Sequence, residues 1–158
     1  MDAAVQSSWK KAVKHYDAAE YFLNVTYPSL KDPILFIGII TNIFSSLEAA
    51  MDSVLIHGQN QGMVPKGATT FLEKLRVFRS RSAQQHAIPH EYLHLMADIK
   101  NVLDFHKKSP IEFRRKGTFF ICAKEYEIQS LTITDIRSHL YKAQEFLKLV
   151  EVIINSRY

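Results

Sequence analysis

The sequence carries a His-Glu-x-x-His pattern at His90, Glu91 and His94. On a helix, two histidines four residues apart share one face and can bind one zinc ion, and the glutamate can then activate a metal-bound water. The pattern follows Pro89 directly, so it belongs to a first helical turn, where a solvated Glu91 is also favoured by the helix dipole. No spacing selects a third ligand from His86, His106, Asp98 or another acid. A zinc-dependent hydrolase is one hypothesis.

A second group lies further along the same predicted helix, where Lys100 and Asn101 precede His106. Six helical residues span about 9 Å and place Lys100 and His106 roughly 120° apart. Both side chains therefore touch one phosphate only if the helix end unwinds or if two copies of the chain meet. His106 also falls on the apolar stripe of this helix, so a packed, hydrogen-bonded core histidine is the competing interpretation.

This second group resembles the motif of the HEPN superfamily of small helical proteins. There an Arg and a polar residue, often Asn, precede a His, with four to six residues between the Arg and the His. The segment Glu48-Ala49-Ala50 in a long apolar helix resembles the family's Glu-Ala pattern. The resemblance implies a metal-independent ribonuclease without cofactor, in which His106 performs acid–base transfer at a ribose 2′-hydroxyl. It also implies a homodimer with the motif near its two-fold axis.

One departure from the family concerns the phosphate. Lys100 stands where the family has an Arg, and a lysine supplies the charge without the planar fork of a guanidinium. The resemblance therefore implies either a ribonuclease or a catalytically weakened relative. Arg81 and His86 fit the same loose spacing, but they lie in a predicted loop without the polar neighbour, and they rank second.

The net charge of +4 is unevenly distributed along the chain. Residues 66–116 contain eleven Lys and Arg against five Asp and Glu, whereas the rest contains nine against eleven. If the third helix packs beside the end of the fourth, these cations would form one RNA-binding patch, through release of counterions from phosphates. Its members would be Lys74, Arg76, Arg79, Arg81, Lys107, Lys108, Arg114, Arg115 and Lys116. Phe113, Phe119 and Phe120 lie near them and could stack on unpaired bases.

Helical periodicity predicts the elements that position these groups. Pro28 ends the first helix, because a proline disfavours helix in the residue before it. A capping box of Thr70 and Glu73 starts the third helix, and a break follows at residues 80–88. Pro89 starts the fourth. The predicted helices cover residue 7 or 8 to 27, then 33–57, 71–79 and 89–108.

The last part of the chain changes period and then returns to helix. Residues 117–131 contain two apolar runs around residues 123–125 and are predicted to form a β-hairpin. Thr132 and Asp135 then cap a final helix, with Leu131 and Ile136 as a hydrophobic staple. Its apolar stripe consists of Ile136, Leu140, Ala143, Leu147, Val150 and Ile154.

These patterns predict a mainly α fold: a single domain over residues 1–158, built as an up-and-down bundle of about five helices with a short β-hairpin before the last. The single cysteine, Cys122, excludes an internal disulfide and suits a reducing compartment. The first residues show no secretory signal, and the longest apolar run, over residues 34–44, is too short to span a membrane. A cytoplasmic protein without membrane contact is predicted.

Three functions remain open at this point. The first is a HEPN-like domain that acts on or near RNA, and the second is the zinc-dependent hydrolase. The third is a non-enzymatic module that binds a protein partner, for example as half of a toxin–antitoxin-type pair.

Overall fold

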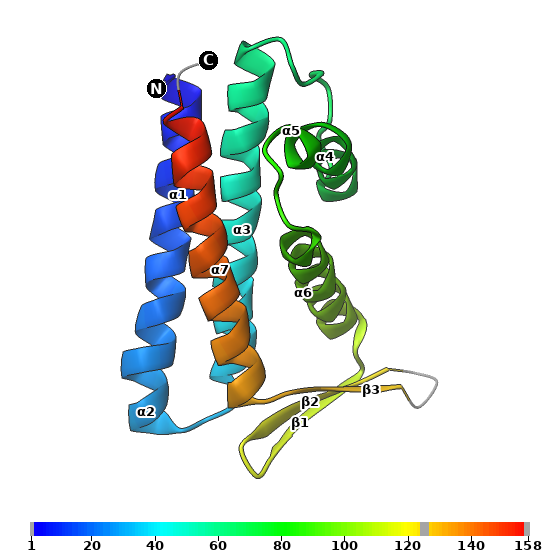
Figure 1. The fold of residues 1–158 in the computed structure, drawn as a ribbon. Helices are drawn as coiled ribbons and strands as arrows, with labels where there is room; N and C mark the ends of the chain where they lie inside the picture. Colours follow the sequence, from blue (N-terminus) through cyan, green and yellow to red (C-terminus); the bar gives the residue numbers. More distant parts are fainter. Residues whose placement is uncertain (1, 124–126, 157–158) are drawn as a thin grey trace.

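Five helical segments and a small sheet make up residues 2–123 and 127–156, which a computed structural model describes (Figure 1). The elements are α1 (Ala3–Tyr21), η1 (Phe22–Thr26), α2 (Tyr27–Leu30), α3 (Leu35–Asn60), α4 (Phe71–Val77), η2 (Phe78–Ser82), α5 (Ala83–Gln85), α6 (His90–Lys108), β1 (Ile111–Arg115), β2 (Thr118–Cys122), β3 (Ile128–Leu131) and α7 (Ile133–Ile154). The long helices α1, α3 and α7 stand side by side, with both chain ends at one end of the bundle and the sheet at the other. The predicted fold class is confirmed.

The first helix continues past Pro28, so its predicted end at Tyr27 is wrong. It passes from α1 through the π-helical turn η1 into α2 without a break. In η1 the N–H of Tyr27 donates to the carbonyl of Phe22, five residues back. This wide turn lies directly before a proline, which lacks an N–H and would crowd the carbonyl of a regular helix. The helix ends at Leu30, and Lys31 follows in the left-handed conformation with a φ of 51°.

Other helix ends also lie beyond their predicted positions. Asp2 caps α1 by accepting hydrogen bonds from the first turn, so this helix begins before residue 7. The helix α3 passes Gly58 and ends at Asn60. Residues 80–85, predicted as a break, are helical in η2 and α5. The break begins only at residue 86, and Ala87 there has a positive φ of 51°.

The helix α3 forms the centre of the bundle, because both α1 and α7 pack against it. Its inward residues include Phe36, Ile39, Ile43 and Leu47, all fully buried. Among the described residues, α3 is also the one helix long and apolar enough to cross a membrane. Of its most apolar window, 61% is buried inside the bundle, so packing in the core accounts for its composition.

The sheet has three antiparallel strands in the order β1-β2-β3, one more than the predicted hairpin. The extra strand, β1, is joined to β2 by a tight turn in which Lys116 and Gly117 have φ values of 50° and 76°. Positive φ at both central residues is the requirement of a type I′ hairpin turn. The predicted turn at residues 123–125 falls mostly on residues 124–126, which lie outside the described residues.

One face of the sheet is turned toward the helices. Glu112 pairs with Ile121 and Arg114 pairs with Phe119 across β1 and β2. Side chains directly opposite each other lie on the same face of an antiparallel sheet. Because Phe119 and Ile121 are buried, Glu112 and Arg114 also belong to the inward face.

The starts of the last two helices agree with prediction. The helix α6 begins directly after Pro89. The helix α7 has the predicted capping box, with the N–H of Asp135 donating to Thr132 Oγ1 and the N–H of Thr132 donating to Asp135 Oδ2. Its predicted apolar stripe is entirely buried.

Candidate functional site

His106 and Glu112 form a hydrogen-bonded pair where α6 gives way to the sheet. Nδ1 of His106 lies 2.7 Å from Oε2 of Glu112. Because an ionised carboxylate only accepts, we assign the proton of this bond to Nδ1, and Nε2 of the neutral ring then keeps a lone pair. The two side chains are 34% and 25% exposed. The imidazole therefore lies at the edge of the core and not within it.

The turn after α6 brings the two members of this pair together. Ser109 leaves the helical conformation, as expected for the residue before Pro110. Oγ of Ser109 lies 2.6 Å from the carbonyl oxygen of Cys122, which ties the turn to β2. Since β1 begins at once, Glu112 folds back over the helix end and reaches His106, six residues earlier.

Two cavities meet at this histidine. The first, which we call the α6 groove, lies between α3 and α6 and measures about 320 Å³. The second, the sheet cavity, lies between the start of α3 and the sheet and measures about 380 Å³. The α6 groove is lined by Ile37, Thr41, Phe44, Lys100, Leu103, His106 and Lys107. The sheet cavity is lined by Ile34, Ile37, Gly38, His106, Glu112, Phe113, Arg114 and Phe119.

Lys100 and His106 line the same groove although they are not on the same side of α6. Nζ of Lys100 lies 6.0 Å from the centre of the Phe44 ring on α3. Nζ is also 3.0 Å from Oδ1 of Asp104, so part of its charge is already compensated. Asn101, the third residue of the predicted motif, is exposed and lines neither cavity. The structure thus brings two of the three motif residues to one hollow.

Arg114 connects the sheet cavity with a third, more open hollow of about 330 Å³ at the β1–β2 turn. Its guanidinium donates to both carboxylate oxygens of Asp32, at 2.6 and 2.8 Å. The backbone N–H of Ile34 and this guanidinium together lower the pKa of Asp32. The hollow is lined by Leu30, Lys31, Asp32, Pro33, Arg114, Arg115, Lys116 and Gly117. Four cations therefore surround one carboxylate here.

The cations predicted to form one patch lie in two separate places. Arg76, Arg79 and Arg81 are exposed on α4 and η2, which lie away from the sheet, beyond the start of α6 (Figure 1). The other group is exposed at the sheet end of the bundle and comprises Lys107, Lys108, Arg114, Arg115 and Lys116. The third helix does not pack beside the end of the fourth, which was the condition for a single patch.

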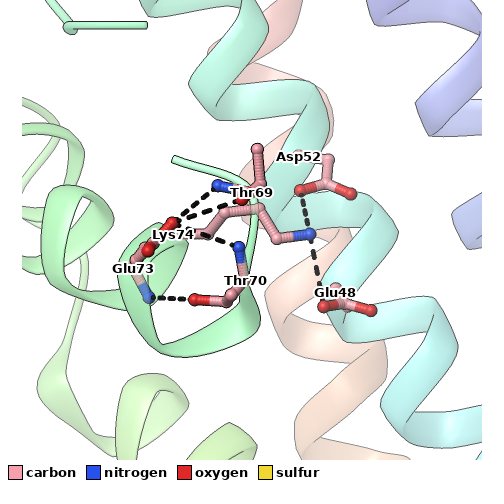
Figure 2. Close-up of polar contacts among 6 residues, drawn as sticks. All are labelled: Glu48, Asp52, Thr69, Thr70, Glu73 and Lys74. Atoms are coloured by element: carbon pink, nitrogen blue, oxygen red, sulfur yellow. Dashed lines mark hydrogen bonds and ion pairs between the residues drawn. The ribbon is translucent and has the colours of Figure 1, made fainter. Parts of the chain in front are cut away.

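Lys74 takes part in neither group, because α4 turns it toward α3. Figure 2 shows its ammonium between two carboxylates, 2.9 Å from Oδ1 of Asp52 and 3.2 Å from Oε2 of Glu48. Burial raises the pKa of Asp52 despite its cationic partner. Burial alone would lower the pKa of Lys74, but the hydrogen bond and charge of Asp52, together with Glu48, outweigh it and raise this pKa. The capping box of Thr70 and Glu73, as predicted, holds the start of α4 beside this cluster.

The His-Glu-x-x-His residues lie in the exposed first turns of α6. His90, Glu91 and His94 all face solvent. Within residues 2–123 and 127–156, no group of three or more His, Cys, Asp or Glu side chains is placed to hold a metal ion. The zinc hypothesis therefore gains no third ligand from the described structure and stays a prediction.

The helix α3 contains two interior glycines with opposite surroundings. A Cβ at Gly58 would lie 2.4 Å from Cγ2 of Val64, so close packing requires glycine there. A Cβ at Gly38 would meet nothing within 4 Å, and Gly38 has ordinary helical conformation. An interior helical glycine destabilises a protein by roughly 0.5–1 kcal/mol relative to alanine. Neither packing nor backbone conformation accounts for Gly38, which lines the sheet cavity.

Sequence reasoning missed Glu112 and Gly38. The signal for Glu112 was the Ser109–Pro110 helix stop shortly after His106, which returns the chain toward the helix end. The predicted aromatic platform is also smaller than expected, because Phe119 is buried. Phe113 stacks on Phe120, with ring centres 4.8 Å apart and planes 18° from parallel.

Comparison of the chain with models of protein families, with curated proteins and with solved structures found no match. The HEPN resemblance therefore stays a prediction from the motif residues. What the site can do follows from its own geometry: an oriented imidazole, accessible from two hollows, with cations on either side.

Proposed function

We propose that this chain is a HEPN-like domain that binds RNA and cleaves it without a metal ion at His106. The observation that carries the proposal is the position of the His106 imidazole, which is hydrogen-bonded to a carboxylate and lines two cavities. Each cavity also has a cation: Lys107 in the α6 groove and, in the sheet cavity, Arg114, which is paired with Asp32. An imidazole beside cations is suited to proton transfer at a phosphodiester.

In the proposed reaction, Nε2 of His106 removes the proton of a ribose 2′-hydroxyl. The O2′–P bond forms while the P–O5′ bond breaks, and the departing 5′-oxygen takes a proton from water. The hydroxide left behind takes the proton of the imidazolium, which restores the neutral ring. The products are a 2′,3′-cyclic phosphate and a 5′-hydroxyl. Glu112 keeps the ring in the reactive tautomer and stabilises its charged form.

Lys107 is the better candidate for holding the phosphate. Lys100 is ion-paired with Asp104, whereas no ion pair to Lys107 is found in the described part of the chain. Lys107 also follows His106 directly and lines the same groove. A lysine acts on a phosphate as a point charge and does not form the paired hydrogen bonds of an arginine. We therefore expect a low cleavage rate.

The test is RNA cleavage in excess EDTA, with product ends identified by mass spectrometry. His106→Ala should lower the cleavage rate by at least about 100-fold, the usual contribution of a positioned acid–base group. His94→Ala, an exposed histidine of the same helix, is the matched control and should cleave like the unmodified chain. Circular dichroism checks that both variants are folded. Equal cleavage by the His106→Ala variant, or cleavage that EDTA abolishes, would contradict the proposal.

The HEPN resemblance also leads us to propose that the chain forms a symmetric homodimer. Light scattering coupled to gel filtration measures this directly, with a mass near twice 18.2 kDa expected. A monomer at micromolar concentration that still cleaves RNA would remove the dimer from the proposal and leave the site intact.

A further inference from the structure

We infer that the sheet cavity receives one unpaired nucleobase of single-stranded RNA, and that Gly38 is glycine because a side chain there would fill the cavity. The inference rests on the proposed function for the identity of the polymer. It adds the form of RNA that is bound and the place where one base lies.

The two interior glycines of α3 differ in what surrounds them. Gly58 is explained by its contact with Val64, whereas the position of a Cβ at Gly38 is empty to 4 Å. Alanine at position 38 would favour the helix and would clash with nothing in the described structure. The space beside Gly38 is thus free for something that the protein itself does not contain, and Gly38 lines the sheet cavity.

The walls of the sheet cavity are both apolar and polar. Apolar side chains of Ile34, Ile37 and Phe119 form much of the lining, and polar groups of His106, Glu112 and Arg114 complete it. A flat aromatic ring with a polar edge suits such walls. The volume of about 380 Å³ is near the lower end of the range of roughly 300–1,000 Å³ for small-molecule sites, which suits one nucleoside.

Basic side chains lie on either side of the sheet cavity. His106 joins it to the α6 groove, with Lys107 and Lys100, and Arg114 joins it to the open hollow, with Arg115 and Lys116. Asp104 and Asp32 compensate Lys100 and Arg114, so a strand whose base enters the sheet cavity meets Lys107 on one side and Arg115 with Lys116 on the other, for the phosphates before and after that base. A base within a cavity cannot be paired, so the bound RNA is single-stranded at this nucleotide.

The test measures binding separately from cleavage. The probe is a fluorescent hexanucleotide with 2′-O-methyl groups throughout, which has no 2′-hydroxyl to attack, and fluorescence anisotropy gives its affinity. Gly38→Leu should weaken binding by about tenfold or more, the size of effect expected when one base can no longer enter its site. Gly38→Ala should already weaken binding, though less than Gly38→Leu, while raising the melting temperature by about 1–4 °C, so that its loss of affinity cannot be ascribed to a loss of stability.

A second probe tests the base site without any substitution in the protein, so its result does not depend on whether the Gly38→Leu variant folds. The same hexanucleotide lacking its third and fourth bases should bind the unmodified chain about tenfold more weakly than the complete one. Equal binding of the two probes, or full affinity in a folded Gly38→Leu variant, would overturn the inference even if RNA is cleaved. Conversely, weakened binding in both tests would support the base site even if RNA is not cleaved, a result that contradicts only the proposed function.

Discussion

Lys74 and His106 are both basic side chains that lie between helices and contact carboxylates, yet their surroundings differ. Lys74 contacts two carboxylates, and its side chain is only 16% exposed. His106 contacts one, Glu112, and twice as much of its side chain is exposed, at 34%. All the charge of Lys74 is used inside the protein, whereas His106 keeps a second ring nitrogen and lines two cavities.

The comparison shows why a cluster of cations in a sequence is weak evidence for a binding surface. Lys74 belongs by sequence to the same basic run as Arg76 and Arg79. Its partners, Glu48 and Asp52, come from the middle of α3 and compensate its charge. The number of carboxylates that a cation meets, more than its place in the sequence, decides whether it remains free for a ligand.

The largest expected effect concerns the pair of His106 and Glu112. Glu112→Gln should lower RNA cleavage by roughly 100-fold, less than the 10⁴-fold known for a buried triad aspartate, because Glu112 is partly exposed. Timed cleavage assays at pH 7 give the rate, and circular dichroism checks that the variant is folded. An unchanged rate in the folded Glu112→Gln variant would contradict the role of Glu112 in orienting the imidazole.

Substitutions in the cluster of Lys74, Glu48 and Asp52 should change the stability of the protein and leave its RNA affinity unchanged. Lys74→Met leaves Glu48 and Asp52 facing each other unpaired, and we expect urea denaturation to show a loss of about 1–3 kcal/mol in the free energy of unfolding. Adding Asp52→Asn should recover part of that loss, because it removes one unpaired charge. RNA affinity below the unfolding transition should stay unchanged. A drop in affinity would place Lys74 in the binding surface after all.

The two cation groups should differ in their effect on salt dependence. Replacing Arg115 and Lys116 by alanine should reduce the slope of log affinity against log salt by about 0.7 for each phosphate of single-stranded RNA that the protein no longer neutralises. The matched control, Arg76→Ala with Arg79→Ala, removes the same net charge at the other end of the bundle. Equal slopes for the two double variants would mean that total charge, and not the sheet end, determines binding.

The smallest expected effect concerns a second histidine, His139, which lies on α7. Nδ1 of His139 is buried without a hydrogen-bond partner among the described residues. Burial lowers the pKa of His139, with smaller and opposing contributions from Asp135, Lys142 and Asp98. The unfolded chain then binds a proton at His139 more readily than the folded chain does. The free energy of unfolding is therefore highest above the usual pKa of histidine and falls as the pH drops below that pKa.

His139→Gln should therefore flatten the decline in stability between pH 7.5 and pH 5.5, by under about 1 kcal/mol at the acid end. Thermal melts at matched ionic strength give the comparison. The same decline in both proteins would assign the pH dependence to other groups.

The helix starts that could be predicted are those fixed by residues within one helical turn of the start. Thr70 and Thr132 each form hydrogen bonds with the residue three positions later. Pro89 directly precedes α6, and its ring fixes the backbone φ angle there. The predictions that failed needed distant information. Pro28 is accommodated by a π-helical turn inside a long packed helix, and β1 forms because β2 is there to pair with it.

For the candidate site, the sequence identified His106, Lys100, Lys107 and Arg114 by residue type, and it could not say which of them share a hollow. The pairing of His106 with Glu112, the compensation of Lys74 and the empty space above Gly38 each join elements that are separate along the chain.

The sequence by itself therefore determined the bundle, because helical periodicity and caps act between residues within a few positions of each other. Only the tertiary structure decided which charges are enclosed and which face a cavity. Those contacts depend on how α3, α6 and the sheet are rotated against one another, and this rotation is set by the packing of the whole core.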